Sequence, residues 1–401
     1  MSDGRPLTVL CVATFEKGHE FLRECRRQGC RVLLLTLDTL AEATWPREAI
    51  DDIFYMRKGA TPDDFVKGVS HLARTERLDR IVALDDFDVE TAALLREHLR
   101  VPGMGETTAR YFRDKLAMRV RARNAGIRVP AFVAVVNDQD IRAFLEQVPP
   151  PWVLKPRSQA AAIGIRKLHH PDGVWQAIEG LGDRRSFHVL EAFVSGDVYH
   201  VDAIVWDRDV PFAVAHRYGA PPMQVAHEGG IFVTTNLPPG SADRHELLRL
   251  NRDVLQALGY VRGVSHTEFI RGSHDGAWYF LETSARVGGA HIVELVEAAT
   301  GINLWREWAR LEIAGEHGHY VVPPHRERAA GLVLSLARQE TPDTSGYVDP
   351  EITFRVTRPH HAGLIVASDD RGRIEALVAE YVERFRRDFY ATAPPLDSPT
   401  S

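Results

Sequence analysis

The sequence predicts an α/β fold for its N-terminal part and an α+β fold for the rest. In the first hundred residues, apolar strand-like runs alternate with helical runs, which is typical of a parallel sheet covered by helices. Farther along, residues 198–219 read as two strands joined at DRD, which predicts an antiparallel hairpin. A length of 401 residues with 44% hydrophobic and 26% charged residues suits two or three globular domains.

The N-terminal α/β region has three predicted strands and three predicted helices. The strands are expected at 7–14, 30–37 and 79–86, and the helices at 15–29, 61–78 and 89–99. The turn after the first strand, ATFEKG, contains one glycine, whereas a dinucleotide-binding turn follows GxGxxG. We therefore expect a structural domain whose loops contribute to a neighbouring site.

The middle of the chain mixes helices with strands. Helices are expected at 107–126, 138–151, 172–181, 241–259 and 292–314. Besides the hairpin, strands are expected within 152–170 on either side of a small-residue loop, and at 186–196, 263–272 and 277–285. Gly126 and the prolines at 149–151 provide the helix ends that this pattern needs.

The last part has strands predicted at 329–337, 351–358 and 362–369, followed by a helix at 371–389. One face of that helix is apolar and should be buried. Its residues are Ile374, Leu377, Val378, Tyr381, Val382 and Phe385. The tail 393–401, rich in proline, serine and threonine, is expected to be disordered.

The charge and cysteine content indicate which classes of partner and which cellular compartment to expect. With a net charge of -6, the chain lacks the excess of basic residues that is typical of proteins that bind nucleic acid or anionic membranes, so small-molecule substrates are expected. Cys11, Cys25 and Cys30 show no CxxC spacing and are expected to be buried or free thiols. Without a signal-like start or a membrane-length apolar run, the expected location is the cytoplasm.

Two acidic residues interrupt apolar strand-like runs. Glu268 lies in SHTEFI and Glu282 in FLETSARVGGAH. If these strands pair antiparallel, the two carboxylates can lie side by side on one face, and their repulsion requires a cation. Oxygen ligands without a cysteine cluster suit Mg²⁺, which shares its coordination with substrate phosphates. The alternative is a pair of exposed hairpin carboxylates.

Two lysines are candidates for binding the phosphates. Lys155 interrupts the apolar run WVLKPR before the loop SQAAAIGI, whose small residues let backbone N–H groups approach phosphate oxygens. Lys115 lies in the helical stretch FRDKLAM. The alternatives are a surface cation for Lys155 and a solvated helix residue for Lys115.

The order of these features resembles the ATP-grasp superfamily. A helical lysine, a strand lysine before a small-residue loop, a LEAFV strand and two acidic strands ending in E-x-S-x-R follow in the family's order over residues 111–313. The resemblance implies a Rossmann-like α/β pre-domain at 1–110 and an ATP-grasp domain at 111–318, with a lid subdomain at about 150–195. A small α+β lobe at 319–392 would follow.

The resemblance also implies ATP as the cofactor and assigns residues to it. Lys155 and Lys115 match the family's phosphate-contacting lysines, and Ser158 to Gly164 matches the lid over the triphosphate. Glu191 matches the hinge acid near the adenine amino group, and His200 a ribose-side position. The implied nucleotide contacts are Lys115, Lys155, Ser158, Gly164, Glu191, Ala192, Val194 and His200.

The implied metal ligands are Glu268, Glu282 and Ser284, for Mg²⁺ or Mn²⁺. The family usually has asparagine at the position of Ser284, and its lid is usually richer in glycine than SQAAAIG. Many relatives carry a ribose-binding glutamate where this chain has Val198, which leaves His200 or Asp202 as substitutes. These departures bear on nucleotide affinity more than on the fold.

HTEF followed by ETSARVGGAHI looks similar to the L-amino-acid ligase and carnosine synthase-like branch. The resemblance implies an ATP-dependent carboxylate–amine ligase that forms an acyl-phosphate and releases ADP and phosphate. Lys155 and Arg286 would be catalytic. Arg286, Gly288 and Gly289 would border the pocket for an amino-acid-like substrate, with a small-molecule carboxylate and amine as partners and a possible homodimer.

Further substrate candidates are Arg217, His227 and Glu228, with ordinary loop or surface positions as the alternative. Paired histidines at 169–170, 317 and 319, and 360–361 suggest zinc, but their loop contexts favour solvated side chains. Two other functions stay open. One is a biotin carboxylase-like enzyme, although the chain has no biotin-accepting M-K-M; the other is a nucleotide-binding protein without chemistry.

Overall fold

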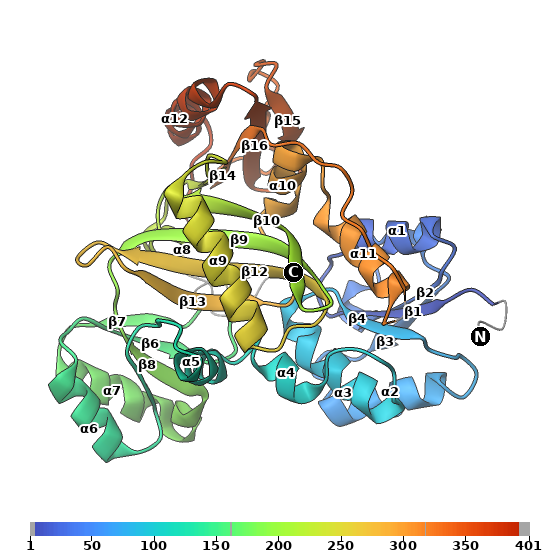
Figure 1. Ribbon diagram of the computed structural model, residues 1–401, viewed down its shortest axis with the longest axis horizontal. Coiled ribbons are helices and arrows are strands. Elements are labelled where there is room, and N and C mark those ends of the chain that lie inside the picture. The colour runs from blue at the N-terminus through green and yellow to red at the C-terminus, as the bar shows by residue number, and fades with distance from the viewer. Residues whose placement is uncertain (1–4, 161–162, 317, 393–401) are drawn as a thin grey trace.

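The computed structural model describes residues 5–160, 163–316 and 318–392 (Figure 1). Within these residues the strands form three sheets. Their strand orders are β3-β2-β1-β4, β5-β8-β6-β7 and β13-β12-β9-β10-β11-β14-β16-β15. The predicted disorder of the tail 393–401 concerns residues outside the described part.

The N-terminal sheet is parallel, as the alternation of strands and helices predicts. Its elements are β1 (Thr8–Ala13), α1 (His19–Arg27), β2 (Arg31–Leu37), β3 (Asp52–Met56), α2 (Pro62–Leu72), β4 (Arg80–Ala83) and α3 (Val89–Leu99). Strand β3 was not predicted, because it lies at the sheet edge with no fully buried residue and so lacks a continuous buried apolar run. Cys11, Cys25 and Cys30 are buried and free, as expected.

Two helices connect this domain to the second sheet: α4 (Glu106–Arg110) and α5 (Lys115–Asn124). The single helix predicted at 107–126 is therefore wrong. Asp114 accepts hydrogen bonds from the backbone N–H groups of Leu116 and Ala117, so it caps a new helix after a turn. This cap places Lys115 at the first position of α5.

The second sheet is a small antiparallel layer covered by two helices. Its elements are β5 (Phe132–Ala134), α6 (Asp138–Gln147), β6 (Trp152–Pro156), β7 (Arg166–Leu168), α7 (Pro171–Leu181) and β8 (His188–Ala192). Strand β5 was not predicted, and the other five elements match the strands and helices predicted across 138–196. Short 3₁₀ helices lie at Asp38–Leu40, Arg47–Ala49, Asp86–Asp88 and Gly182–Phe187.

The third sheet is the antiparallel centre of the molecule. Its strands are β9 (Gly196–Trp206), β10 (Asp209–Tyr218), β11 (Phe232–Asn236), β12 (Gly263–Gly272), β13 (Trp278–Ser284), β14 (Ala329–Leu336), β15 (Ile352–Arg355) and β16 (His361–Ser368). The predicted hairpin is confirmed, and Asp207 and Arg208 turn with φ of 50° and 66°. The strand β11 was not predicted.

The helices that accompany this sheet are α8 (Pro222–Glu228), α9 (Ala242–Ala257), α10 (Ile292–Thr300), α11 (Leu304–Ala314) and α12 (Arg371–Asp388). The single helix predicted at 292–314 is wrong, because Gly301 ends α10 with φ of 82° and Asn303 caps α11. The apolar face predicted for α12 is confirmed: it packs into the cluster formed with β14 and β16. No described helix has the length and apolar character to cross a bilayer.

The two faces of the central sheet differ in their cover. On one face, Tyr199 and Val201 of β9 pack with Leu247 of α9 and Met118 of α5. On the other face, Ile204 joins an apolar cluster shared with α10, α11 and the N-terminal domain. A second small apolar cluster on this face contains Val198, Tyr218 and Ile270. The strand segments between these two clusters carry the polar residues described below.

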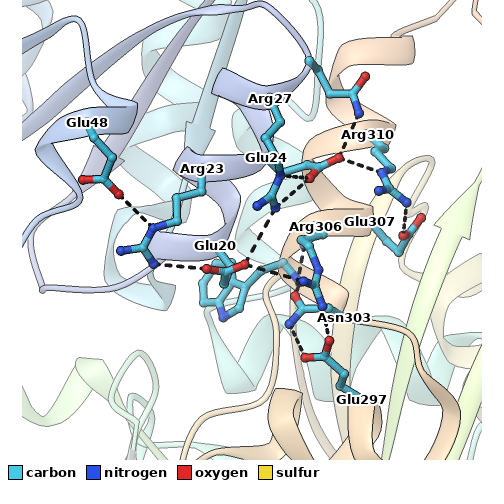
Figure 2. A network of polar contacts seen from close by, with 12 residues as sticks. Glu20, Arg23, Glu24, Arg27, Glu48, Glu297, Asn303, Arg306, Glu307 and Arg310 are labelled. Atoms are coloured by element: carbon cyan, nitrogen blue, oxygen red, sulfur yellow. Dashed lines mark hydrogen bonds and ion pairs between the residues drawn. The ribbon is translucent and has the colours of Figure 1, made fainter.

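The N-terminal domain is fastened to the central domain through α1 and α11, as Figure 2 shows. The rings of Phe21 and Trp308 meet edge to face at 5.4 Å. Glu24, only 2% exposed, accepts hydrogen bonds of 2.8 Å from both Arg27 and Arg310. This contact fixes the N-terminal sheet beside the central sheet.

Candidate active site

A row of polar residues crosses four neighbouring strands of the central sheet. Strand register pairs His216 of β10 with His200 of β9, His200 with Glu268 of β12, and Glu268 with Glu282 of β13. The prediction that the two glutamates lie side by side on antiparallel strands is therefore confirmed. Since the described Glu268 and Glu282 are both at least half-buried, the alternative of two exposed carboxylates is wrong.

A second row lies two residues farther along the same strands. It pairs Asp202 of β9 with His266 of β12, and His266 with Ser284 of β13. Because strand side chains alternate with a period of two, both rows point to the same face. Ser284 thus shares a face with Glu282, one row away from it, and its role as a metal ligand stays a prediction.

The two predicted phosphate lysines approach this face from α5 and β6. Each is only 7% exposed, so the alternatives of a surface cation and a solvated helix residue are wrong. The Nζ of Lys115 lies 2.9 Å from Oε2 of Glu282. Burial raises the pKa of Glu282, but Lys115 and Lys155 outweigh it and lower that pKa to about 2.

Lys155 belongs to a buried charge cluster with Glu191 and Arg119. Oε2 of Glu191 lies 2.6 Å from Nζ of Lys155, and its Oε1 lies 2.9 Å from Nε of Arg119. Burial lowers the pKa of Lys155 to about 8, although Glu191 opposes that change. Burial would raise the pKa of Glu191, but the two cations hold it below its usual value. Sequence analysis missed Arg119, although it lies four residues after Lys115 and so on the same helix face.

The other predicted adenine contacts lie where β8 ends. The backbone N–H of Ala192 donates to the carbonyl of Ala131 at 2.8 Å. Val194 packs against the apolar cluster of Val198, Tyr218 and Ile270. An apolar wall of this kind suits a flat ring, and the adenine assignment stays a prediction.

The start of the predicted lid is held by two cations. Arg113 donates to the carbonyl of Ser158 at 2.5 Å, and Lys115 donates to the carbonyl of Gln159 at 2.7 Å. Arg113 also bonds Asp86 of the N-terminal domain at 2.7 Å. Gly164, at the far end of the loop, has φ of 72°, which favours glycine. Residues 161–162 of this loop lie outside the described part.

His200 is fully buried with both ring nitrogens close to protein partners. Its Nδ1 lies 2.7 Å from Oδ2 of Asp202, and its Nε2 lies 2.8 Å from Oγ1 of Thr234. Burial lowers the pKa of His200 to about 3, so the ring is neutral. A ribose hydroxyl would have to displace one of these partners to bind the ring, so the predicted ribose contact lacks support from the geometry.

His266 contacts the same carboxylate, that of Asp202, but unlike His200 it is protonated. Its Nδ1 lies 2.8 Å from Oδ1 of Asp202, and its Nε2 lies 3.7 Å from Oε1 of Glu268. Burial lowers the pKa of His266, but Asp202 and Glu268 more than offset this and raise it to about 9. The buried Asp202 is therefore balanced by an imidazolium. Burial acts to raise the pKa of Asp202, and the neighbouring histidines hold it well below its usual value.

Arg286 follows β13 at the edge toward the N-terminal domain. It donates to the carbonyl of Val287 at 2.6 Å. Burial lowers its pKa, but Asp86 and Asp85, which follow β4, keep it above the usual value. Asp85 forms an ion pair with Lys17, which follows β1. The carboxyl ends of parallel strands are where open α/β sheets place ligands, so these loops face the same side as Arg286.

The glycines after β13 differ in their surroundings. A Cβ added to Gly288 would lie 2.9 Å from Oδ1 of Asp202 and 2.7 Å from Ile292. Only glycine fits where the chain passes this close to the buried carboxylate. Gly289 is exposed, and a Cβ there would meet nothing within 4 Å. Their roles in a substrate pocket stay predictions.

The three remaining substrate candidates are exposed. Arg217 projects from the face opposite to His216 and Tyr218 and pairs with Asp197 at 2.8 Å, so the structure places it away from the glutamates. His227 and Glu228 are exposed on α8, and their roles stay predictions. The sequence contains a signal for the polar residues on the buried face that was not used in the prediction. The segments HVD, HRY and HTE each place two polar side chains on one strand face.

Four of the paired histidines are exposed, as their loop contexts predict: His169, His170, His319 and His360. His361 differs, because it is half-buried and begins β16, and His317 lies outside the described residues. The one described group with metal-ligand spacing is instead buried and consists of His200, Asp202 and His266.

Comparison with known proteins places this geometry in context. No family model matches the chain. An L-arginine-specific L-amino acid ligase of Bacillus subtilis is 28% identical over 242 residues, which are 59% of this chain and 58% of that protein. A D-alanine–D-alanine ligase of Dechloromonas aromatica is 23% identical over 195 residues, 48% of this chain and 63% of that protein. The chain thus spans less than two thirds of the length of these relatives.

Two solved structures match over nearly the whole chain. The L-amino acid ligase from Bacillus licheniformis has a TM-score of 0.74 at 19% identity and covers 97% of this chain and 100% of its own. The N5-carboxyaminoimidazole synthetase from Staphylococcus aureus, complexed with ADP, has a TM-score of 0.71 at 15% identity and covers 93% and 96%. The predicted fold is confirmed: this chain has the ATP-grasp fold and, among its sequence relatives, resembles the L-amino acid ligases.

Proposed function

We propose that this protein is an ATP-dependent ligase that joins a carboxylate to an amine, with amino-acid-like substrates. One observation carries the proposal. The buried Lys115 and Lys155 converge with the paired Glu268 and Glu282, and Lys115 touches Glu282 directly at 2.9 Å. Buried lysines beside paired carboxylates suit a phosphate chain bound together with a divalent cation.

The residues present fit such a cation. Glu268 and Glu282 supply hard oxygen ligands from paired strands, which Mg²⁺ and Mn²⁺ prefer over nitrogen or sulfur. When bound, the cation would neutralise charge on the transferring phosphate. Lys155, with its pKa lowered to about 8, keeps its charge at neutral pH and would bind phosphate oxygens. The apolar wall at Val194 would border the adenine ring.

The reaction begins when the substrate carboxylate attacks the terminal phosphorus of ATP and ADP leaves. An amine then attacks the acyl carbon and displaces phosphate. Arg286, which remains protonated, would hold the acyl-phosphate or the substrate carboxylate, and the two lysines would position the phosphates. Positioning and charge stabilisation of this kind need no covalent link to the enzyme.

The test measures ADP and phosphate release with amino acids offered singly and in pairs. We expect release to depend on a carboxylate and an amine together, and an amide product to appear in equal amount. AMP and pyrophosphate would contradict the acyl-phosphate route. Bicarbonate-dependent release would instead support a carboxylase, and ATP binding without turnover would support a nucleotide-binding protein.

Glu282→Gln tests the metal role within the same assay. The substitution keeps the shape of the side chain but removes the charge that anchors the cation, so we expect turnover to be lost while nucleotide binding weakens less. Glu246→Gln is the control, because Glu246 lies on α9 with its side chain 40% exposed and pairs with Arg249. Equal kcat and equal Mg²⁺ dependence in both variants would contradict the metal assignment.

We also propose a homodimer and a cytoplasmic location. Three free buried thiols suit a reducing compartment. The association state can be measured by light scattering, and a mass of one chain at micromolar concentration would contradict the dimer.

A further inference from the structure

Glu268 is held by a second residue that sequence analysis did not single out. The hydroxyl of Tyr218, on β10, donates to Oε1 of Glu268 at 2.9 Å. Tyr218 is only 5% exposed, so this hydrogen bond lies in the buried part of the sheet face.

The ring of Tyr218 packs against the ring of His200. Their centres lie 4.6 Å apart with planes tilted by 35°, and His200 also stacks on His216 at 4.5 Å with planes 11° apart. The nitrogens of His200 approach Asp202 and Thr234, so its ring has little freedom to turn. The tyrosine rests against a ring that hydrogen bonds hold in place.

Asp202 also contacts His266, which faces the same oxygen of Glu268. His266 lies 2.8 Å from Asp202 through Nδ1 and directs Nε2 toward Oε1 of Glu268 at 3.7 Å. His200, Asp202 and His266 are all buried. Buried polar groups cost free energy unless they are paired, and a fully paired network holds its members in one geometry.

We propose that Tyr218 is a positioning residue for Glu268, supported beneath by the network of His200, Asp202 and His266. Tyr218 binds Oε1, which leaves Oε2 available for the cation that Glu268 and Glu282 would hold together. The proposal rests on the proposed role of Glu268 as a metal ligand. It assigns the buried histidines to the support of that ligand and not to the ribose of ATP.

A resident transition metal is the other occupant that His200, Asp202 and His266 could accept. The geometry favours direct hydrogen bonds. The Nδ1 atom of His200 and the Nδ1 atom of His266 lie 2.7 Å and 2.8 Å from separate oxygens of Asp202, which is hydrogen-bond distance. In addition, the Nε2 of His200 is already 2.8 Å from Thr234. Metal analysis of the purified protein therefore belongs to the test.

The test compares Tyr218→Phe with Tyr260→Phe by calorimetry. Both tyrosines are buried, but the hydroxyl of Tyr260 donates to the carbonyl of Val264 at 3.0 Å, so it makes no bond to Glu268. Each protein is titrated with the non-hydrolysable ATP analogue AMP-PNP, once with Mn²⁺ and once with a chelator. The ratio of the two dissociation constants measures how much the metal contributes to binding.

We expect Tyr218→Phe to lower this ratio about tenfold or more, as loss of an outer-shell partner does at other metal sites. The affinity for AMP-PNP without metal should stay the same. A merely structural defect would instead change the affinity in both titrations. Tyr260→Phe should keep the wild-type ratio. His266→Gln is the second variant and should lower the ratio as well.

The outcomes separate the two proposals. A wild-type ratio near one would overturn the metal role of Glu268 and the present inference with it. A clear wild-type ratio that Tyr218→Phe leaves unchanged would overturn only the positioning role. Stoichiometric zinc, cobalt or nickel in the purified protein would also overturn it, because His200, Asp202 and His266 would then be ligands of that ion.

Discussion

Replacing Glu191 by glutamine should destabilise the protein strongly, because this one carboxylate balances two buried cations. Glu191 is 3% exposed, Arg119 is fully buried and Lys155 is 7% exposed. Both cations lie within 2.9 Å of the carboxylate. Glutamine has the same shape, so the substitution changes the charge and spares the packing.

The expected cost follows from what each cation can do once the carboxylate is gone. Removing one partner from a buried ion pair usually costs about 3–5 kcal/mol. Lys155 can reduce its share of this free-energy cost by releasing a proton and becoming neutral, since its pKa is already lowered to about 8. Arg119 cannot lose its proton in a protein, so the cost stays near 3 kcal/mol, about a hundredfold in the folding equilibrium constant.

The assay is urea-induced unfolding at pH 7, followed by tryptophan fluorescence and circular dichroism. Asp197→Asn is the control, because Asp197 is 55% exposed in its pair with Arg217 and such surface pairs contribute at most about 1 kcal/mol. A second measurement is the pH dependence of kcat/KM for ATP. Loss of Glu191 should lower the pKa of Lys155 further and shift the alkaline decline of kcat/KM to lower pH.

The reasoning would be refuted if Glu191→Gln unfolded at the same urea concentration as Asp197→Asn and kept the wild-type pH profile. Such a result would mean that Arg119 and Lys155 find other anions, or water, without cost. It would also return Glu191 to the adenine-side role that the family resemblance implies.

Three further predictions concern other parts of the site and the domain contact. As pH rises from 7 through 8, Lys155 loses its charge, so kcat/KM for ATP should fall, and Lys155→Arg should flatten that profile; an unchanged slope would argue against Lys155 as the titrating group. Arg310→Ala should lower the free energy of unfolding by about 1–2 kcal/mol in urea titrations, because the buried Glu24 loses one of its hydrogen-bond donors; no shift in midpoint would show that the remaining partners suffice. Gly288→Ala should abolish ligation and lower the melting temperature, because the new methyl group would lie 2.9 Å from Asp202; normal melting would show that the chain can move aside.

Local patterns in the sequence were enough to predict most strands and helices and the pairing of Glu268 with Glu282, and the resemblance to the ATP-grasp superfamily predicted the fold. Alternating apolar runs marked the strands, and the paired positions of Glu268 and Glu282 followed from two antiparallel strands with a short connection. Lys155 stood out as a charge within an apolar run, whereas Lys115 gained its predicted role from the family resemblance. Each of these signals lies within a few neighbouring residues, where side-chain periodicity is decided.

Helix boundaries and an edge strand were not predicted by these patterns. The two helices predicted as single ones broke at Asp114 and Gly301, where a cap and a left-handed residue outweighed the helical periodicity. Strand β3 lay at a sheet edge and so lacked a full apolar pattern. These errors arise because a helix boundary depends on one local hydrogen bond, whereas the pattern averages over many residues.

The pairing of charges was decided only by the tertiary structure. The sequence determined that Glu191, Lys155 and Arg119 are charged, and periodicity determined which strand or helix face each occupies. It could not determine that one carboxylate meets both cations, because Arg119 and Glu191 are 72 residues apart. The same holds for Tyr218 and Glu268, which are 50 residues apart. A buried charge that has lost its contact with water needs a partner of opposite charge. Which residue becomes that partner is decided by the path of the chain through the fold.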